Sequence, residues 1–265
     1  MNAPSILLDP AAVCRRLGGV ALALVAINMG LQVARLVLQQ ENLPGLPMLS
    51  LDKENNVPAL FSTLLLFTAA LILAFVALLE RVRARQDAPK WFILAAGFLL
   101  MGVDESLSLH ERMIEPMRAL LGSSLGVERL GIFYFAWVVP AIALVIALGI
   151  YFLPFMGRLP RRTGMMLLVS AAIYLGGALG VELVEGWWRE GHGHRNVVYH
   201  GLVSLEEGME MIGIVLLIHT LLDFLSARHG EVRIALVGDA RTVPEGPALT
   251  RENDIPQMLG RSAIE

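Results

Sequence analysis

The stretch around which this chain is organised reads MGVDESLSLHERMIE and covers residues 101–115. It continues an apolar run that begins at Trp91, and its second half is acidic. The sequence predicts one unbroken helix over residues 91–112, because the next residue that disfavours a helix is Pro116. The polar residues that matter inside this helix are Asp104, Glu105, His110 and Glu111. Packing in apolar surroundings does not require carboxylates, so their presence in this helix predicts a functional or binding site.

Two later apolar segments carry carboxylates in the same way. They cover residues 163–186 and 197–225, and their acidic residues are Glu182, Glu185, Glu206, Glu207 and Glu210. A charge in apolar surroundings is costly unless it is paired or coordinates a metal. The question is therefore what these three groups of carboxylates hold.

The composition is that of a membrane protein. Of 265 residues, 55% are hydrophobic and 17% are charged, whereas soluble domains average about 45–50% and about 25%. The net charge of −3 offers no basic surface for nucleic acid, so no nucleic-acid partner is expected. The single cysteine, Cys14, excludes an internal disulfide and a cysteine-rich metal site.

Six segments are long enough to cross a bilayer, which takes about 20 mostly apolar residues. They are residues 17–38, 57–79, 91–112, 130–155, 163–186 and 197–225. The sequence therefore predicts an all-α, polytopic bundle of six transmembrane helices within residues 1–225. Residues 226–265 are polar and contain several glycines and prolines, which predicts a flexible cytoplasmic tail.

Two local features refine this picture. Pro140 lies inside the fourth segment and predicts a kink that neighbouring helices can accommodate. Gly176 and Gly180 are four residues apart in the fifth segment, a spacing that permits close approach of another helix.

The distribution of Lys and Arg predicts the orientation, because cytoplasmic loops carry the excess. One set of loops and flanks contains Arg15, Arg16, Arg81, Arg83, Arg85, Lys90, Arg158, Arg161, Arg162, Arg228 and Arg233. The opposite side has Lys53, Arg112, Arg118, Arg129, Arg189 and Arg195. We therefore expect both termini in the cytoplasm and a multi-pass location in the inner membrane.

With this orientation the acidic residues fall at similar depths. Asp104 lies about 20 Å along its helix from Trp91, which leaves it about 10 Å below the outer surface. Asp104, Ser108 and Glu111 would share one stripe of a continuous helix, and His200, Ser204 and Glu207 an equivalent one. Glu206 is expected to point away from Glu207. The third, fifth and sixth helices should then be neighbours that face their carboxylates toward each other.

Burying several carboxylates costs on the order of 10 kcal/mol, and bound metal, bound protons or a water-filled vestibule could each offset that cost. Oxygen ligands with one or two histidines are typical of iron, manganese or zinc, so we expect a divalent metal ion. Its predicted ligands are Asp104, Glu111, Glu182, Glu207, Glu210, His110 and His200. The predicted supporting residues are Glu105, Glu185, Glu206, Ser108 and Ser204.

The acidic pattern resembles that of a set of uncharacterised bacterial multi-pass inner-membrane proteins. The resemblance rests on the Asp104-Glu105-x4-His110-Glu111 motif, on Glu182, and on Glu206-Glu207-x2-Glu210. It implies a membrane location and no particular activity. The helices are also similar in composition to ferritin-like di-iron bundles. Those use Glu-x-x-His twice, whereas this chain has Glu182-x-x-Glu185 and Glu207-x-x-Glu210.

Three functions are compatible with these features. The first is a membrane-embedded metalloenzyme, a hydrolase or an oxidoreductase, acting from the periplasmic side on a lipid or another hydrophobic small molecule. The second is a transporter or channel whose carboxylates bind protons or cations in transit. The third is a structural or assembly protein. The substrate and the oligomeric state stay open at this point.

Overall fold

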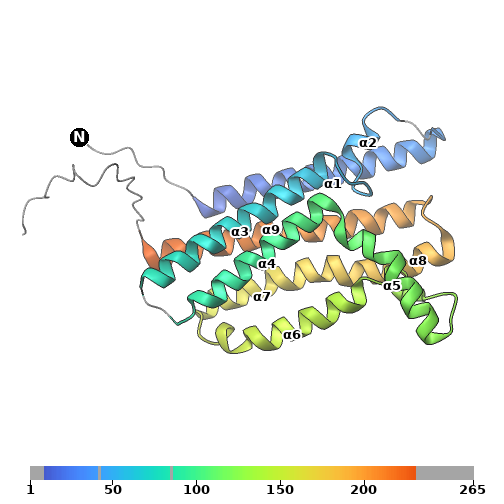
Figure 1. Ribbon diagram of the computed structural model, residues 1–265. Helices are drawn as coiled ribbons and strands as arrows, with labels where there is room; N and C mark the ends of the chain where they lie inside the picture. The colour runs from blue at the N-terminus through green and yellow to red at the C-terminus, as the bar shows by residue number, and fades with distance from the viewer. Residues whose placement is uncertain (1–8, 41–42, 84–85, 231–265) are drawn as a thin grey trace, which may run out of the picture. The chain divides into compact units, whose positions relative to one another are not determined.

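The computed structural model describes residues 9–40, 43–83 and 86–230, and every regular element in these ranges is a helix (Figure 1). The long helices are α1 (Pro10–Leu38), α3 (Val57–Val82), α4 (Ala88–Leu107), α5 (Leu109–Leu125), α6 (Val138–Met156), α7 (Arg161–Leu175), α8 (Glu182–His192) and α9 (Val197–His229). The short ones are α2 (Leu46–Leu49), η1 (Gly131–Phe133) and η2 (Gly176–Val181).

Within the described ranges, five helices are long and apolar enough to cross a membrane, or six if α4 and α5 count as one bent span. Helices α7, η2 and α8 together form one of them, Arg161–His192. The outward faces are apolar, as lipid-facing surfaces are: Leu71, Val82, Ile150 and Leu153 are all at least 70% exposed. The predicted all-helical class is thus confirmed for the described residues, with five or six helices able to cross a membrane.

Side-chain caps fix where three of the spans begin. Asp9 accepts a hydrogen bond from the Ala11 amide, with Pro10 at the first helical position of α1. Asn56 and Asn196 cap α3 and α9 in the same way, each through its side-chain oxygen. Both helices start at the residues expected from the sequence.

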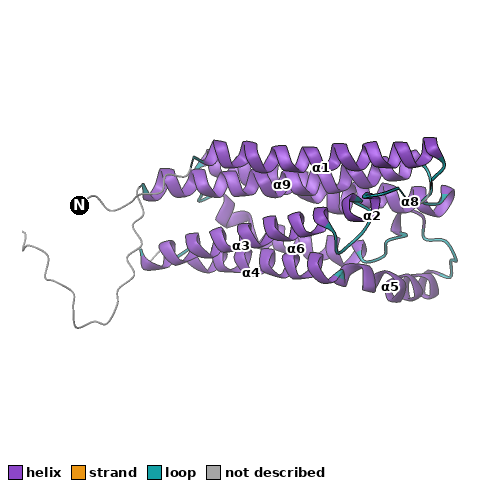
Figure 2. Cartoon of the chain, turned by 90° about the horizontal axis from the view of Figure 1, so that it is seen from above, coloured by secondary structure: helices purple, strands orange, loops and turns teal. Residues whose placement is uncertain are grey.

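Helix α9 is the centre of the bundle. It packs against α1, α3, α7, η2 and α8, while α3 packs along α4. Figure 2 shows α1 and α9 side by side, with α5 and α8 near the same end. The apolar core lies along α3 and α9 and includes Leu73, Val76, Met211 and Ile218, each at most 1% exposed.

Glycine permits the close crossing of α9 with α7 and η2. A Cβ on Gly177 would lie 2.8 Å from the Glu206 carbonyl oxygen, and one on Gly213 would lie 2.8 Å from Tyr174. Of the two glycines predicted to permit close approach, Gly176 and Gly180, only the first lies at a tight contact. A Cβ on Gly176 would lie 2.9 Å from Met209 Cε, but nothing lies within 4 Å of one on Gly180. The second tight position is therefore Gly177.

The predicted unbroken helix over residues 91–112 is wrong. Helix α4 ends at Leu107, Ser108 adopts a left-handed conformation with φ of 49°, and α5 leaves at an angle of 81°. The break is stabilised locally, because Asp104 accepts a hydrogen bond from the His110 amide at 2.9 Å. Helix α5 then continues through Pro116. It has no buried residue and lies across the end of the bundle (Figure 1).

Three other expectations change. Pro140 is the third residue of α6, where its missing N–H has no helical partner to lose, so it does not interrupt the helix. Residues 131–133 form the short helix η1 instead of the first turn of that span. Helix α9 continues to His229, past the predicted boundary at 225. The predicted tail from residue 231 onward lies outside the described residues.

Candidate functional site

A cavity of about 310 Å³ opens at the end of the bundle where α5 and α8 lie. Its wall includes ten acidic residues: Asp52, Glu54, Asp104, Glu105, Glu111, Glu182, Glu185, Glu206, Glu207 and Glu210. The basic residues of the wall are Lys53, His110 and Arg189. Four helices, α4, α5, α8 and α9, thus bring the three predicted acidic groups to one place, at similar depths in the bundle.

The corner between α4 and α5 positions His110. Its Nδ1 lies 2.8 Å from Asp104 Oδ2, and its backbone amide donates to Asp104 Oδ1. The His110 ring also packs 4.9 Å from the Trp137 ring. Asp104 therefore acts first as the cap of α5 and the partner of His110, which leaves Nε2 as the ring nitrogen that can meet a ligand.

Glu182 and Glu185 enter the cavity directly after the π-helix η2. Wider turns of this kind frequently occur at functional sites. Glu182 Oε1 accepts a hydrogen bond of 2.7 Å from Trp137 Nε1. Glu185 is 4% exposed, and its Oε2 has no hydrogen-bond partner among the described residues. This buried, unpartnered oxygen faces a cavity already rich in negative charge.

Helix α9 contributes three glutamates to the same wall. Glu206 lies next to Glu185, Glu207 next to Glu105, and Glu210 next to Tyr174. Glu206, a predicted supporting residue, thus lines the cavity beside Glu185 of α8. The close contact with η2 at Gly177, described above, brings this part of α9 against the start of α8. Carboxylates this near to one another cannot all be ionised without a shared proton or cation.

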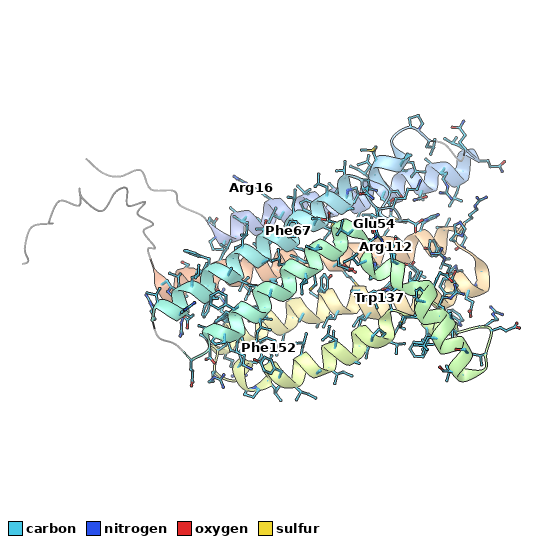
Figure 3. The ribbon with its side chains drawn as sticks, in the orientation of Figure 1. Arg16, Glu54, Phe67, Arg112, Trp137 and Phe152 are labelled. Atoms are coloured by element: carbon cyan, nitrogen blue, oxygen red, sulfur yellow. The ribbon has the colours of Figure 1, made fainter. Side chains whose placement is uncertain are left out.

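Sequence reasoning missed a second polar group at the rim. The Tyr199 hydroxyl donates a hydrogen bond of 3.1 Å to Asp52 Oδ1 and accepts one of 3.3 Å from Arg189 Nη1. Glu54, in the same loop as Asp52, has its pKa raised by burial and by the nearby charge of Glu111. Figure 3 shows Glu54 before α3 and Trp137 at the start of α6, both toward this end. The sequence did contain a signal for this group, namely two acidic residues, Asp52 and Glu54, in the loop directly before α3.

Three predicted residues do not line the cavity. Ser108 forms the bend between α4 and α5. Ser204 accepts a hydrogen bond from Asn28 and donates to the His200 carbonyl, so it joins α9 to α1. The His200 ring is 3% exposed, and both of its nitrogens lack a partner among the described residues. The predicted stripe of His200, Ser204 and Glu207 therefore does not face one site.

The other nine predicted residues all line the cavity. They are Asp104, Glu105, His110, Glu111, Glu182, Glu185, Glu206, Glu207 and Glu210. Within the described part of the chain, no group of three or more His, Cys, Asp or Glu side chains is arranged as a ready-made metal site. The carboxylates surround the cavity without converging on one point.

Comparison with protein families gives a match over residues 17–225 to a family described as Domain of unknown function (DUF8692). No curated protein and no solved structure matches the chain. The matched region runs from α1 to α9 and contains all ten acidic residues of the cavity. Because it covers more than half of the sequence, the chain belongs to the family Domain of unknown function (DUF8692).

Proposed function

We propose that this protein is a membrane-embedded enzyme that uses a divalent metal ion, held by the carboxylates of the cavity, to act on a hydrophobic molecule. The observation that carries the proposal is the charge imbalance of the cavity wall, with ten acids against Lys53, His110 and Arg189. The contrast with the other end of the bundle supports it. Glu80 is also buried, at 2% exposed, but Arg228 pairs with it at 2.8 Å.

The metal ligands are chosen by burial and position. Glu185 is the first, since its Oε2 is buried and unpartnered. Glu182, Glu206 and Glu210 are in the same wall, and His110 offers Nε2. Binding of one ion by these residues requires their side chains to change rotamer, which the three side-chain torsions of glutamate allow. Iron, manganese and zinc are the metals that suit oxygen ligands with one imidazole.

A metal ion in this position would supply a Lewis acid or an activated water molecule. The surrounding residues then have distinct tasks. Trp137 fixes one oxygen of Glu182, and Asp104 fixes the ring of His110. Carboxylates that do not bind the ion would accept and return protons. This chemistry suits a hydrolase or an oxidoreductase.

A transport pathway is less well supported, because aromatic side chains fill the space between α4, α6 and α9 at the end of the bundle opposite the cavity. Trp91 is 1% exposed and packs against Phe155 and Phe224, with ring centroids 5.1 and 5.3 Å away. These three residues come from α4, α6 and α9. A pathway between these three helices would have to pass the three rings, and none of them carries a charge.

The proposed orientation places the cavity on the periplasmic side of the inner membrane and both termini in the cytoplasm. The sequence bias supports it, since most arginines of the spans' flanks lie at the end opposite the cavity. Helix α5, at 81° to α4, would then lie along the outer surface.

The test is elemental analysis of the protein purified in detergent. We expect one or two divalent metal ions per chain in the wild type. The Glu185→Gln variant should lose most of this bound metal. Glu115→Gln is the matched control, because Glu115 lies on α5, is 81% exposed and faces away from the cavity. Equal metal in both variants, or none in the wild type, would refute the proposal. The second result would favour protons as the bound cations.

A further inference from the structure

We infer that the cavity takes a single-chain lipid, which enters from the membrane beside α6, lays its hydrocarbon chain along that helix and presents its polar end to the carboxylates. The inference rests on the proposed function and names the substrate class of that site. Its chemistry is that of a fatty-acid-like amphiphile, with one hydrocarbon chain and an oxygen-bearing end that a metal ion can bind.

The cavity has an apolar arm that continues from its acidic part. One face of α6 forms this arm through Ala141, Leu144, Val145 and Leu148, which are spaced as one helical stripe. Met101 of α4 and Leu175 of α7 line it as well. The stripe is about 10 Å long at the helical rise of 1.5 Å per residue. It starts one turn from Trp137, which contacts both Glu182 and His110.

The wall formed by α6 is open toward the membrane. Leu144 lines the cavity and is still 60% exposed, and Leu148 lines it and is 39% exposed. Helix α6 packs against η2 and only sparsely against its other neighbours. Figure 1 shows it at the edge of the bundle beside α7, and Phe155 near its end packs against Trp91 of α4. In a bilayer the groups outside such a wall are hydrocarbon chains, so the arm can be reached without passing through water.

The size of the cavity favours one chain over two. Its volume of about 310 Å³ is at the lower end of the range of ligand pockets, about 300–1,000 Å³. On α6 the apolar arm consists of one helical stripe, which suits one acyl chain. An apolar ligand without a polar end would leave the acidic part without a partner, which argues for an amphiphile.

The experiment uses a palmitic acid analogue with a diazirine near the end of its chain, added to the full-length protein in nanodiscs. After photolysis, mass spectrometry locates the labelled peptides. We expect label on α6 between Ala141 and Leu148. Ala141→Trp fills the arm and should reduce this label about tenfold or more, whereas Ala143→Trp should not. Ala143 is two residues away, exposed, and on the opposite side of α6.

A second pair of variants guards against a folding defect. Val145→Phe narrows the arm, and Ile146→Phe adds the same bulk at a residue that is 58% exposed and outside the cavity. Equal labelling within both pairs, or label confined to other helices, would overturn the inference. So would equal competition by unlabelled dioleoyl phosphatidylcholine and unlabelled palmitic acid, since a two-chain lipid should compete poorly.

Metal content separates this inference from the proposed function. Ala141→Trp should retain the wild-type amount of metal, because Ala141 offers no ligand. Wild-type protein that binds metal but shows no specific label would refute the lipid chain and leave the metal site standing. Specific label in a protein without metal would refute the metal site and leave the lipid site to be explained by the protonated carboxylates.

Discussion

The close packing of η2 on α9 can be tested by adding one methyl group at Gly177. In Gly177→Ala the new Cβ would lie 2.8 Å from the Glu206 carbonyl oxygen, 3.1 Å from Met209 Cβ and 3.3 Å from Glu210 Cγ. The nearest atom belongs to the backbone of a central helix and cannot rotate away. Helix α9 and η2 must therefore separate by several tenths of an ångström.

The size of the effect follows from two opposing contributions. Overpacking of a filled interface costs about 1–3 kcal/mol, while replacing Gly by Ala within a helix contributes about 1 kcal/mol of stability. Gly180→Ala is the matched control, because a Cβ there meets nothing within 4 Å and only the second contribution applies. The two variants should therefore differ in free energy of unfolding by about 1–3 kcal/mol, with Gly177→Ala the less stable.

The assay is thermal unfolding in detergent followed by circular dichroism, with metal content measured on the same samples. Because Gly177 supports the part of α9 that carries Glu206 and Glu210, its variant should also bind less metal than Gly180→Ala. Equal stability of the two variants would show that the helices are not as close as described here. The positioning of the α9 carboxylates would then need another explanation.

Three further predictions concern single side chains. Trp137→Phe removes the hydrogen bond to Glu182 and should weaken metal binding about 10–100-fold, measured by chelator competition; unchanged affinity would exclude Trp137 as a positioning residue. Asp104→Ala removes the cap of α5 and should cost about 0.5–2 kcal/mol, seen as faster hydrogen exchange in residues 109–115; unchanged exchange would contradict the cap. Glu54 has a raised pKa in the folded protein, so its ionisation opposes folding once the pH exceeds the usual value of 4.5. Glu54→Gln should therefore raise the melting temperature at pH 8 and have little effect at pH 4; the reverse order would contradict the burial of Glu54.

The membrane class and the meeting of the acidic groups could be predicted, because both depend on length, hydropathy and depth. The starts of two helices, at Val57 and Val197, could also be predicted, and the structure shows that Asn56 and Asn196 cap them. These are local or one-dimensional properties. The depth of a residue along a helix can be calculated from the rise per residue alone. This explains why Glu182 and Glu210 were correctly predicted to lie at the same end of the bundle.

Direction around a helix was harder to predict, because it requires an uninterrupted helix. The left-handed Ser108 turns everything after it by 81°, and no glycine or proline marks that position. The wider turn of η2 likewise changes the direction in which Glu182 and Glu185 point. The hydrogen bond between Tyr199 and Asp52 joins residues that are 147 positions apart in the sequence. Helical periodicity predicts contacts within one helix and cannot predict a contact of this kind.

The most direct measurement of the central claim is X-ray absorption at the edge of the metal found in the purified protein. Binding by the cavity predicts a nearest shell made mainly of carboxylate oxygens, with one imidazole nitrogen that is lost in His110→Gln. It also predicts that Glu185→Gln removes most of the absorption edge itself. A shell containing sulfur, a spectrum of a fully hydrated ion, or an edge of equal height in Glu185→Gln would contradict the assignment of the metal to these carboxylates.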